Sequence, residues 1–190
     1  EEPFGGGYLI LGSADSQPGF PDVDLLNFVS GETTGFKIIG PAAYSQAGKA
    51  VGGGGDYNGD GIKDILISAP NYYFTSHGLV YVIYGHDSDF VDINLAGFTT
   101  GPAGFIIIGQ DSDDYVGSVL SNAGDVNGDD FDDIVVCAPT KGLPGKESAG
   151  ACYVVFGQST STRTTDLYLS AIAATATGGF RITGSVEYEN

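Results

Sequence analysis

Two nine-residue segments of the chain carry oxygen-bearing side chains at the same four positions. DYNGDGIKD occupies residues 56–64, and DVNGDDFDD occupies residues 125–133. Their first, third, fifth and ninth residues are Asp56, Asn58, Asp60 and Asp64 in one segment and Asp125, Asn127, Asp129 and Asp133 in the other. Carboxylate and amide oxygens on a tight turn are the ligands that calcium prefers. The spacing therefore predicts two Ca²⁺ sites.

An EF-hand begins with the same pattern, but the residues that follow do not fit one. An EF-hand needs a Glu at the twelfth position and a helix on each side. Ile67 and Val136 stand at the twelfth positions, and neither has a ligand oxygen. The segments that follow, DILISAP and DIVVCAP, are rich in β-branched residues and end in a proline, which a helix interior rejects. Each loop is therefore expected to join two strands, with its ninth residue completing the coordination.

The alternative for each loop is an Asx-rich turn without a metal. Three carboxylates on nine residues repel one another unless a cation lies between them, which favours the calcium interpretation.

Composition limits the class of protein. The 190 residues suffice for one domain with a core, and 31 Gly, 11 Tyr and 11 Phe favour strands joined by tight turns. The formal net charge of -17 disfavours nucleic acid and anionic membranes and suits cations or basic partners. No apolar run approaches the roughly 20 residues of a membrane helix, so direct membrane insertion is not expected. The chain starts with EEPFGGG, which resembles neither an initiator Met nor a signal peptide, so a processed or partial chain is expected.

Short apolar segments recur at a spacing of about 70 residues. GFKIIG, GFIIIG and GFRITG begin at residues 35, 104 and 179, and GYLILG, VYVIYG and CYVVFG begin at residues 7, 80 and 152. Asp24, Asp92 and Asp166 each open a further apolar stretch. The chain is therefore a tandem array of one structural unit.

Each unit reads as four short antiparallel strands. A Gly-rich strand leads into the calcium loop, and a strand ending in SAP or CAP, an aromatic strand and the GF strand follow. This is the composition of a β-propeller blade, and glycines suit the crowded centre of such a ring. A β-solenoid is disfavoured because its rungs are six or nine residues long. We therefore predict an all-β fold of propeller blades.

The repeated motifs resemble those of a known family. The string from GFKIIG through AGKAV, GDYNGDGIKDILISAP and GLVYVIYG resembles the FG-GAP repeat of the integrin α-subunit β-propeller, and the second unit matches as well. SAP and CAP replace GAP, and AGKA is a loose version of the FG segment. Asp130 replaces the glycine found at Gly61, and Asp tolerates a positive φ better than most residues.

The resemblance implies details of the site and of the function. The calcium loop would join the innermost strand of a blade to the second strand, and its seventh residue, Ile62 or Phe131, would contribute a backbone carbonyl. The calcium would be structural. The protein would be an extracellular or cell-surface module for adhesion, protein–protein interaction or assembly rather than an enzyme.

With the strand order of the family, the chain is one propeller segment, residues 1–190, of about two and a half blades. Residues 7–40 would form the outer half of one blade, and 46–109 and 115–184 would form complete blades. Propellers need about four to eight blades. The chain is therefore either a fragment of a longer propeller or a subunit whose copies complete one another. Because open strand edges and an apolar blade face favour association, we expect the isolated chain to self-associate or to bind a protein ligand there.

Cys137 ends one predicted strand and Cys152 begins its hairpin partner. Residues opposite each other across a hairpin can form a disulfide when the register allows it. Two small buried thiols are the alternative.

We find no catalytic constellation. His77 and His86 have no HExxH motif around them, and Ser68 and Ser118 lie in no nucleophile elbow. Two alternatives to an adhesion module stay open: a non-catalytic propeller within a larger secreted hydrolase, and a polymerising structural subunit.

Overall fold

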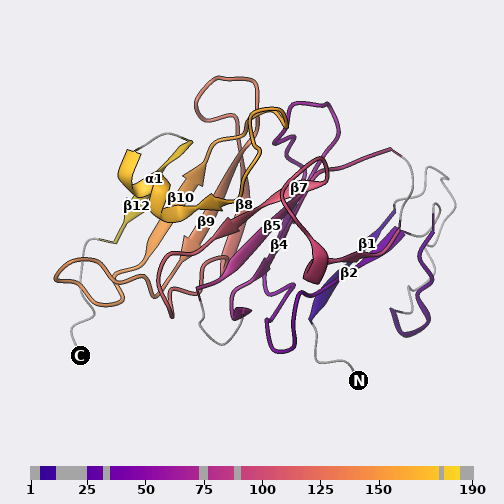
Figure 1. The fold of residues 1–190 in the computed structure, drawn as a ribbon, viewed down its shortest axis with the longest axis horizontal. Coiled ribbons are helices and arrows are strands. Elements are labelled where there is room, and N and C mark those ends of the chain that lie inside the picture. Colours follow the sequence, from indigo (N-terminus) through magenta and orange to yellow (C-terminus); the bar gives the residue numbers. More distant parts are fainter. Residues whose placement is uncertain are drawn as a thin grey trace, which may run out of the picture.

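The computed structural model describes residues 5–11, 25–31, 35–72, 77–87, 91–175 and 178–184. In that part of the chain the regular structure is almost entirely β, in three sheets placed side by side (Figure 1). Sheet A contains β1 (Gly6–Ile10), β2 (Gly35–Ile39) and β6 (Ile93–Asn94). Sheet B contains β3 (Val51–Gly53), β4 (Ile65–Ala69), β5 (Leu79–Ile83), β7 (Gly104–Ile108) and β11 (Leu167–Tyr168). Sheet C contains β8 (Val119–Gly124), β9 (Asp133–Ala138), β10 (Ala151–Val155) and β12 (Gly179–Thr183).

Sheets B and C have the strand order of a propeller blade. In sheet B, β3, β4, β5 and β7 are antiparallel neighbours in that order, and in sheet C the same order is formed by β8, β9, β10 and β12. The predicted all-β fold with four antiparallel strands per blade is therefore confirmed. The short strand β11 adds to the outer edge of sheet B in a parallel direction.

The strands of sheet A pair in the same way as the two outer strands of sheets B and C. β1 and β2 pair antiparallel, as β5 pairs with β7 and β10 with β12. The carbonyl oxygen of Gly5 accepts a hydrogen bond from the backbone N–H of Gly40 (2.8 Å), and Gly78 and Gly150 accept the equivalent bonds in the other two sheets. Of the residues used to count repeats, Gly12, Asp24 and the segment 185–190 lie outside the described residues.

The stretches that follow Asp92 and Asp166 contain helical turns that the sequence did not predict. β6 runs into the 3₁₀ turn η3 (Leu95–Gly97), and β11 runs into α1 (Leu169–Thr175), which is a seven-residue α-helix. A further 3₁₀ turn, η1, spans Leu25–Asn27. Leu169 and Ile172 are three residues apart and both buried, so one apolar side of α1 packs into the core.

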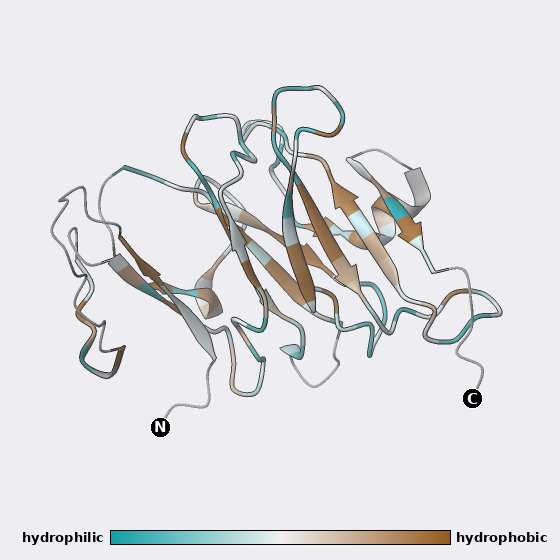
Figure 2. Cartoon of the chain, turned by 180° about the vertical axis from the view of Figure 1, so that it is seen from behind, coloured by the Kyte–Doolittle hydropathy of each residue, from teal (hydrophilic) through white to brown (hydrophobic). Residues whose placement is uncertain are grey.

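The core lies between the sheets, and β5 contributes to it on both faces. All five residues of β5 are buried. Val80 and Val82 join Ile134 and Val136 of β9 in a cluster between sheets B and C. The alternate side chains of β5 join Phe36 and Ile38 between sheets A and B. Figure 2 shows hydrophobic colouring along the central strands and hydrophilic colouring in many of the loops. Sheet B is therefore the middle layer.

Cys137 and Cys152 form a disulfide, with an S–S distance of 2.07 Å. They are directly opposite each other in the β9–β10 register. Ile134, Val136 and Ala138 of β9 face sheet B. Since side chains alternate along a strand, the disulfide lies on the outer face of sheet C.

No helix among the described residues is both long enough and apolar enough to span a membrane.

Candidate metal centre

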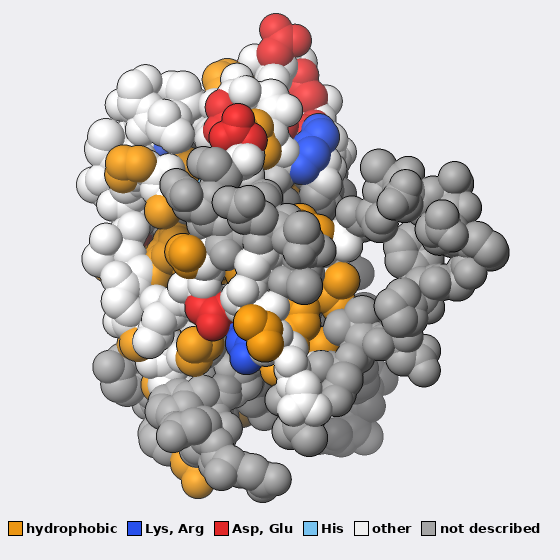
Figure 3. Space-filling view, turned by 90° about the vertical axis from the view of Figure 1, so that its right-hand side faces the viewer, with side chains coloured by type: hydrophobic (Ala, Val, Ile, Leu, Met, Phe, Trp, Pro, Cys, Tyr) orange, Lys and Arg blue, Asp and Glu red, His pale blue; other side chains and the backbone are white. Residues whose placement is uncertain are grey.

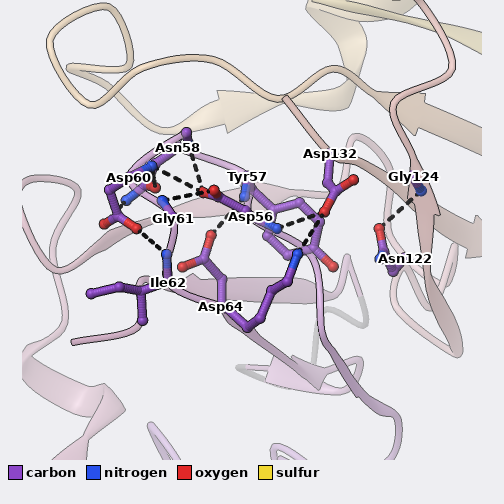
Figure 4. Close-up of polar contacts among 12 residues, drawn as sticks. Asp56, Tyr57, Asn58, Asp60, Gly61, Ile62, Asp64, Asn122, Gly124 and Asp132 are labelled. Carbon is purple, nitrogen blue, oxygen red and sulfur yellow. Dashed lines mark hydrogen bonds and ion pairs between the residues drawn. The ribbon is translucent and has the colours of Figure 1, made fainter. Parts of the chain in front are cut away.

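The first loop, residues 56–64, connects β3 to β4 and is organised by Asp56 (Figure 4). Its carboxylate accepts hydrogen bonds from three backbone N–H groups of the turn. Oδ1 accepts from Gly59 at 2.8 Å and from Asp60 at 3.1 Å, and Oδ2 accepts from Gly61 at 2.8 Å. Such side-chain-to-backbone bonds fix a turn without help from a neighbouring strand.

Asn58 and Asp60 lie beside Asp56 in the same turn (Figure 4). The Asn58 Oδ1 atom accepts from the backbone N–H of Asp60 at 3.0 Å, and its Nδ2 donates to Asp60 Oδ2 at 2.8 Å. Asp60 Oδ1 accepts from the backbone N–H of Ile62 at 2.8 Å. The loop therefore brings its first, third and fifth side chains together.

The ninth residue, Asp64, enters the site from the start of the next strand and is 1% exposed. Its Oδ2 atom accepts from the Tyr57 N–H and its Oδ1 atom from the Gly85 N–H, both at 2.8 Å. Because Gly85 follows β5, this carboxylate ties the loop to the third strand of the same blade.

The second loop, residues 125–133, repeats these hydrogen bonds. Asp125 accepts from the N–H groups of Gly128, Asp129 and Asp130 at 2.7 to 3.1 Å. Asn127, Asp129, Phe131 and Asp133 have the same partners as their counterparts in the first loop. Two different sequences therefore adopt one loop structure, which indicates that the four shared side chains determine it.

Two positions in each loop need a left-handed backbone. Gly59 and Gly61 have φ angles of 75° and 87°, and Gly128 has 80°. At the fourth such position Asp130 has a φ of 71°. Asp enters this region at a lower cost than most residues, which explains why the second loop keeps its shape without the glycine.

The surroundings of the buried aspartate in each loop oppose its ionisation. Burial raises the pKa of Asp64 to about 6, and the nearby Asp60 and Asp56 carboxylates add to this rise against the N–H groups of Gly85 and Tyr57, which lower it. Burial also raises the pKa of Asp133 in the second loop. A cation between the carboxylates would remove the repulsion that opposes their ionisation.

The donor set fits calcium by chemistry, because all four side chains of each loop offer oxygen and three of them are carboxylates. Within the described ranges, however, no three or more His, Cys, Asp or Glu side chains are gathered into a metal cluster. The carboxylates accept backbone N–H groups instead. Calcium at these residues, and the carbonyl roles of Ile62 and Phe131, stay predictions.

The two loops differ in their surroundings. Tyr57, the second residue of the first loop, is 1% exposed in the core between sheets B and C, whereas Val126 at the same place in the second loop is 51% exposed. Asn58 is buried and Asn127 is exposed. The second loop packs against the side of the first loop that carries Tyr57 and Asn58, whereas Gly59, Asp60 and Gly61 stay exposed. Sequence analysis did not foresee this contact.

The contact between the loops is made mainly by Asp132, which the sequence analysis did not single out. Its Oδ2 atom accepts from the backbone N–H of Asp56 at 2.8 Å, and its own N–H donates to the Asp56 carbonyl at 3.0 Å. Lys63 Nζ lies 3.5 Å from the same Oδ2 atom. Figure 4 shows Asp132 beside Asp56. The one sign of this role in the sequence is that the eighth residue of the loop differs between the copies, with Lys63 in the first and Asp132 in the second.

The fold and the loops define the class of the protein. The family model of the FG-GAP repeat matches residues 47–83 and 116–155. Each match runs from the segment before the inner strand, through the loop, to the third strand of one blade. The chain therefore contains two FG-GAP repeats.

Its relatives fall into two groups. Integrin alpha-4 of Xenopus laevis is 28% identical over 157 residues, which is 80% of this chain and 14% of the relative. Integrin alpha-6 of Gallus gallus is 28% identical over 70% of this chain and 12% of the relative. Phosphatidylinositol-glycan-specific phospholipase D of Homo sapiens is 36% identical over 107 residues, 54% of this chain and 12% of the relative. The chain is thus homologous to integrin α-subunits and spans only a small part of the length of these relatives.

Proposed function

We propose that the chain is a calcium-stabilised FG-GAP propeller module that serves adhesion, protein–protein interaction or assembly outside the cell and has no catalytic role of its own. The observation that carries this proposal is the shared structure of the two loops. In both, a buried aspartate and three further oxygen donors are held on a turn fixed by the same hydrogen bonds. Bound calcium would neutralise the negative charge of these neighbouring carboxylates.

The residues of each loop have distinct tasks in this proposal. The first, third and fifth residues would bind the ion from the turn, and the ninth from the following strand. Asp64 also accepts the Gly85 N–H after β5, and Asp133 accepts the Gly157 N–H after β10. An ion at either site would therefore stabilise three strands of its blade. The residues are Asp56, Asn58, Asp60, Ile62 and Asp64 for one ion and Asp125, Asn127, Asp129, Phe131 and Asp133 for the other.

Two observations support an extracellular setting and a protein partner. The Cys137–Cys152 disulfide is typical of an oxidising compartment. The integrin relatives are extracellular or cell-surface proteins. Partner binding would use the loops at the opposite ends of the strands from the metal, such as residues 140–150 after β9, because loops on a rigid scaffold can vary freely.

Thermal unfolding in calcium and in EDTA tests the calcium part. If the affinity lies at about 0.1 to 1 mM, a tenfold excess stabilises each site by roughly 1.4 kcal/mol. Two sites would then raise the melting temperature by roughly 5–10 °C. Asp60→Asn and Asp129→Asn should each remove at least half of the rise. Asp130→Asn removes a charge that is not among the proposed ligands and should retain it. Identical melting curves in calcium and EDTA would contradict the proposal.

The phospholipase D relative supports a second candidate, a non-catalytic propeller within a larger enzyme. The sequence of the full-length gene product distinguishes the two candidates. A flanking hydrolase domain would favour the second, and further repeats or adhesive domains would favour the first.

A further inference from the structure

One side of the first loop, which carries Tyr57 and Asn58, is covered by residues of the next blade, while Gly59, Asp60 and Gly61 are exposed. Phe131 packs so closely on the first loop that a Cβ atom at Gly59 would lie 2.6 Å from its ring. The Tyr57 carbonyl accepts the backbone N–H of Gln158 at 3.0 Å. The described part of the chain places no such neighbour over Val126, which is 51% exposed.

Asp132 makes the contact that reaches closest to the proposed ligands. It holds the peptide groups on both sides of Asp56, accepting the N–H and donating to the carbonyl. Asp56 in turn organises the whole first loop through its three N–H contacts. The side chain of Asp132 is only 23% exposed, so its bond to Asp56 is largely shielded from water. The place of the first ligand is therefore set partly by the second loop.

Asp132 also belongs to the second loop as its eighth residue, directly before the ninth-position Asp133. Because the two residues are adjacent in the chain, an ion that fixes Asp133 would also restrain the backbone of Asp132. The equivalent residue in the first loop is Lys63, whose Nζ atom lies near Asp132 Oδ2. The two residues at position eight, Lys63 and Asp132, thus lie together at the contact between the loops.

We propose that Asp132 is a positioning residue that couples the two loops, so that calcium in the second loop raises the calcium affinity of the first. The inference rests on the proposed calcium binding and adds to it a coupling between the two sites. Coupling between binding sites is reciprocal, so an ion in the first loop should raise the affinity of the second by the same factor. Two of the proposed ligands of the first loop, Asn58 and Asp64, are buried, which strengthens the effect because electrostatic interactions grow as water is excluded.

The test needs a signal that comes mainly from the first loop. Tyr57 supplies one, since tyrosine excites luminescence from a terbium ion bound nearby and the second loop has Val126 instead. Terbium is bound to the whole chain, and calcium is titrated to displace it. Asp132→Ala should weaken calcium binding at the first loop by about tenfold, within the usual range of coupling between sites.

Two further variants separate positioning from charge. Asp132→Asn keeps an oxygen that can accept the Asp56 N–H, so it should retain most of the affinity that Asp132→Ala loses. Asp130→Asn removes a carboxylate from the same loop with no hydrogen bond to the first loop, and should leave the first site unchanged. If Asp132→Asn is as weak as Asp132→Ala, Asp132 acts through its charge and the positioning role is wrong.

A double-mutant cycle tests the coupling itself. Asp129→Ala disables the second site and should weaken calcium binding at the first loop in the wild-type chain. When Asp132→Ala is already present, the effect of Asp129→Ala should be much smaller, because only the backbone N–H of residue 132 and the Phe131 ring still link the loops. The melting temperature in EDTA shows whether each variant folds. A purely structural role of Asp132 would lower this melting temperature and leave its calcium-induced rise unchanged. Equal and independent binding at both loops would overturn the inference, whereas no binding at either loop would contradict the proposed function instead.

Discussion

Cys137 on β9 and Cys152 on β10 are cross-strand partners joined by a disulfide, and the same two places in sheet B are held by Ser68 and Val80. The repeat therefore folds with or without the bond. The disulfide closes a loop of 15 residues on the outer face of sheet C.

Replacing both cysteines should destabilise the chain without changing its fold. Loss of a cross-link over this separation costs about 3 kcal/mol, mainly because the unfolded chain gains freedom. Urea unfolding of the chain with Cys137→Ser and Cys152→Ser measures the loss, and the wild-type chain with a reductant is the control. Equal unfolding midpoints for the double variant and the oxidised chain would show that the bond contributes nothing.

Lys141 should be essential for stability because it neutralises a buried carboxylate. Its Nζ atom is 2.9 Å from Asp114 Oδ2 and also pairs with Asp111, and both Lys141 and Asp114 side chains are 4% exposed. Lys141→Met leaves Asp114 buried without a cation, which should cost about 3 kcal/mol at neutral pH. Chemical unfolding measures this loss.

The first complete blade offers the matched control for Lys141. Tyr72 and Ser45 stand where Lys141 and Asp114 do in the second blade. Lys141→Tyr combined with Asp114→Ser should therefore recover much of the stability lost in Lys141→Met. If Lys141→Met is as stable as the wild-type chain, the pair is not structural.

Asp92 should contribute stability that depends on pH. The Ser30 hydroxyl and the Lys37 backbone N–H donate to its carboxylate and lower its pKa. A lowered pKa means that this contribution is complete above the ordinary value of about 4 and is lost as the pH falls through the folded value. Asp92→Asn should destabilise the chain at pH 6, and this effect should shrink as the pH falls below about 4.

The measurement is the free energy of unfolding in EDTA at several pH values. Asp87→Asn, an exposed acid in the same connection, is the control and should change little. A constant difference between Asp92→Asn and the wild-type chain across this pH range would contradict the assignment.

The isolated chain should self-associate through its end faces. Hydrophobic side chains reach the surface at the sheet A end (Figure 3), where Tyr8 and Ile10 are exposed, and Val119 and Ile182 are exposed on sheet C. Sedimentation should show a mass that rises with concentration. Ile182→Lys should reduce the association even though it lowers the net negative charge. A monomer at every concentration would exclude open-edge assembly.

The repeats made the fold readable from sequence. Strands, loop ends and the order within a blade recur, so each copy supports the interpretation of the others. The disulfide could not be settled in this way, since only one blade carries Cys137 and Cys152. The helix α1 was missed because it occupies a connection that differs between blades, ending in η3 after Asp92 and in α1 after Asp166.

Contacts between blades were the least predictable part. Asp132 against Lys63 and Lys141 against Tyr72 are differences between otherwise equivalent positions. A search for repeats sets such differences aside, although they determine how one blade packs on the next. The recurrence of Asp92 and Asp166 was visible in the sequence, but their contacts were not. Asp92 accepts a hydrogen bond from the Ser30 hydroxyl and Asp166 accepts one from the Thr100 hydroxyl, each in the preceding unit.

Calcium titration calorimetry on the metal-free chain tests the central claim most directly. The account predicts binding of two calcium ions per chain, reduced to one by Asp60→Asn or by Asp129→Asn and unchanged in number by Asp130→Asn. The absence of binding up to about 10 mM calcium, well beyond the weakest affinities typical of extracellular modules, would contradict it.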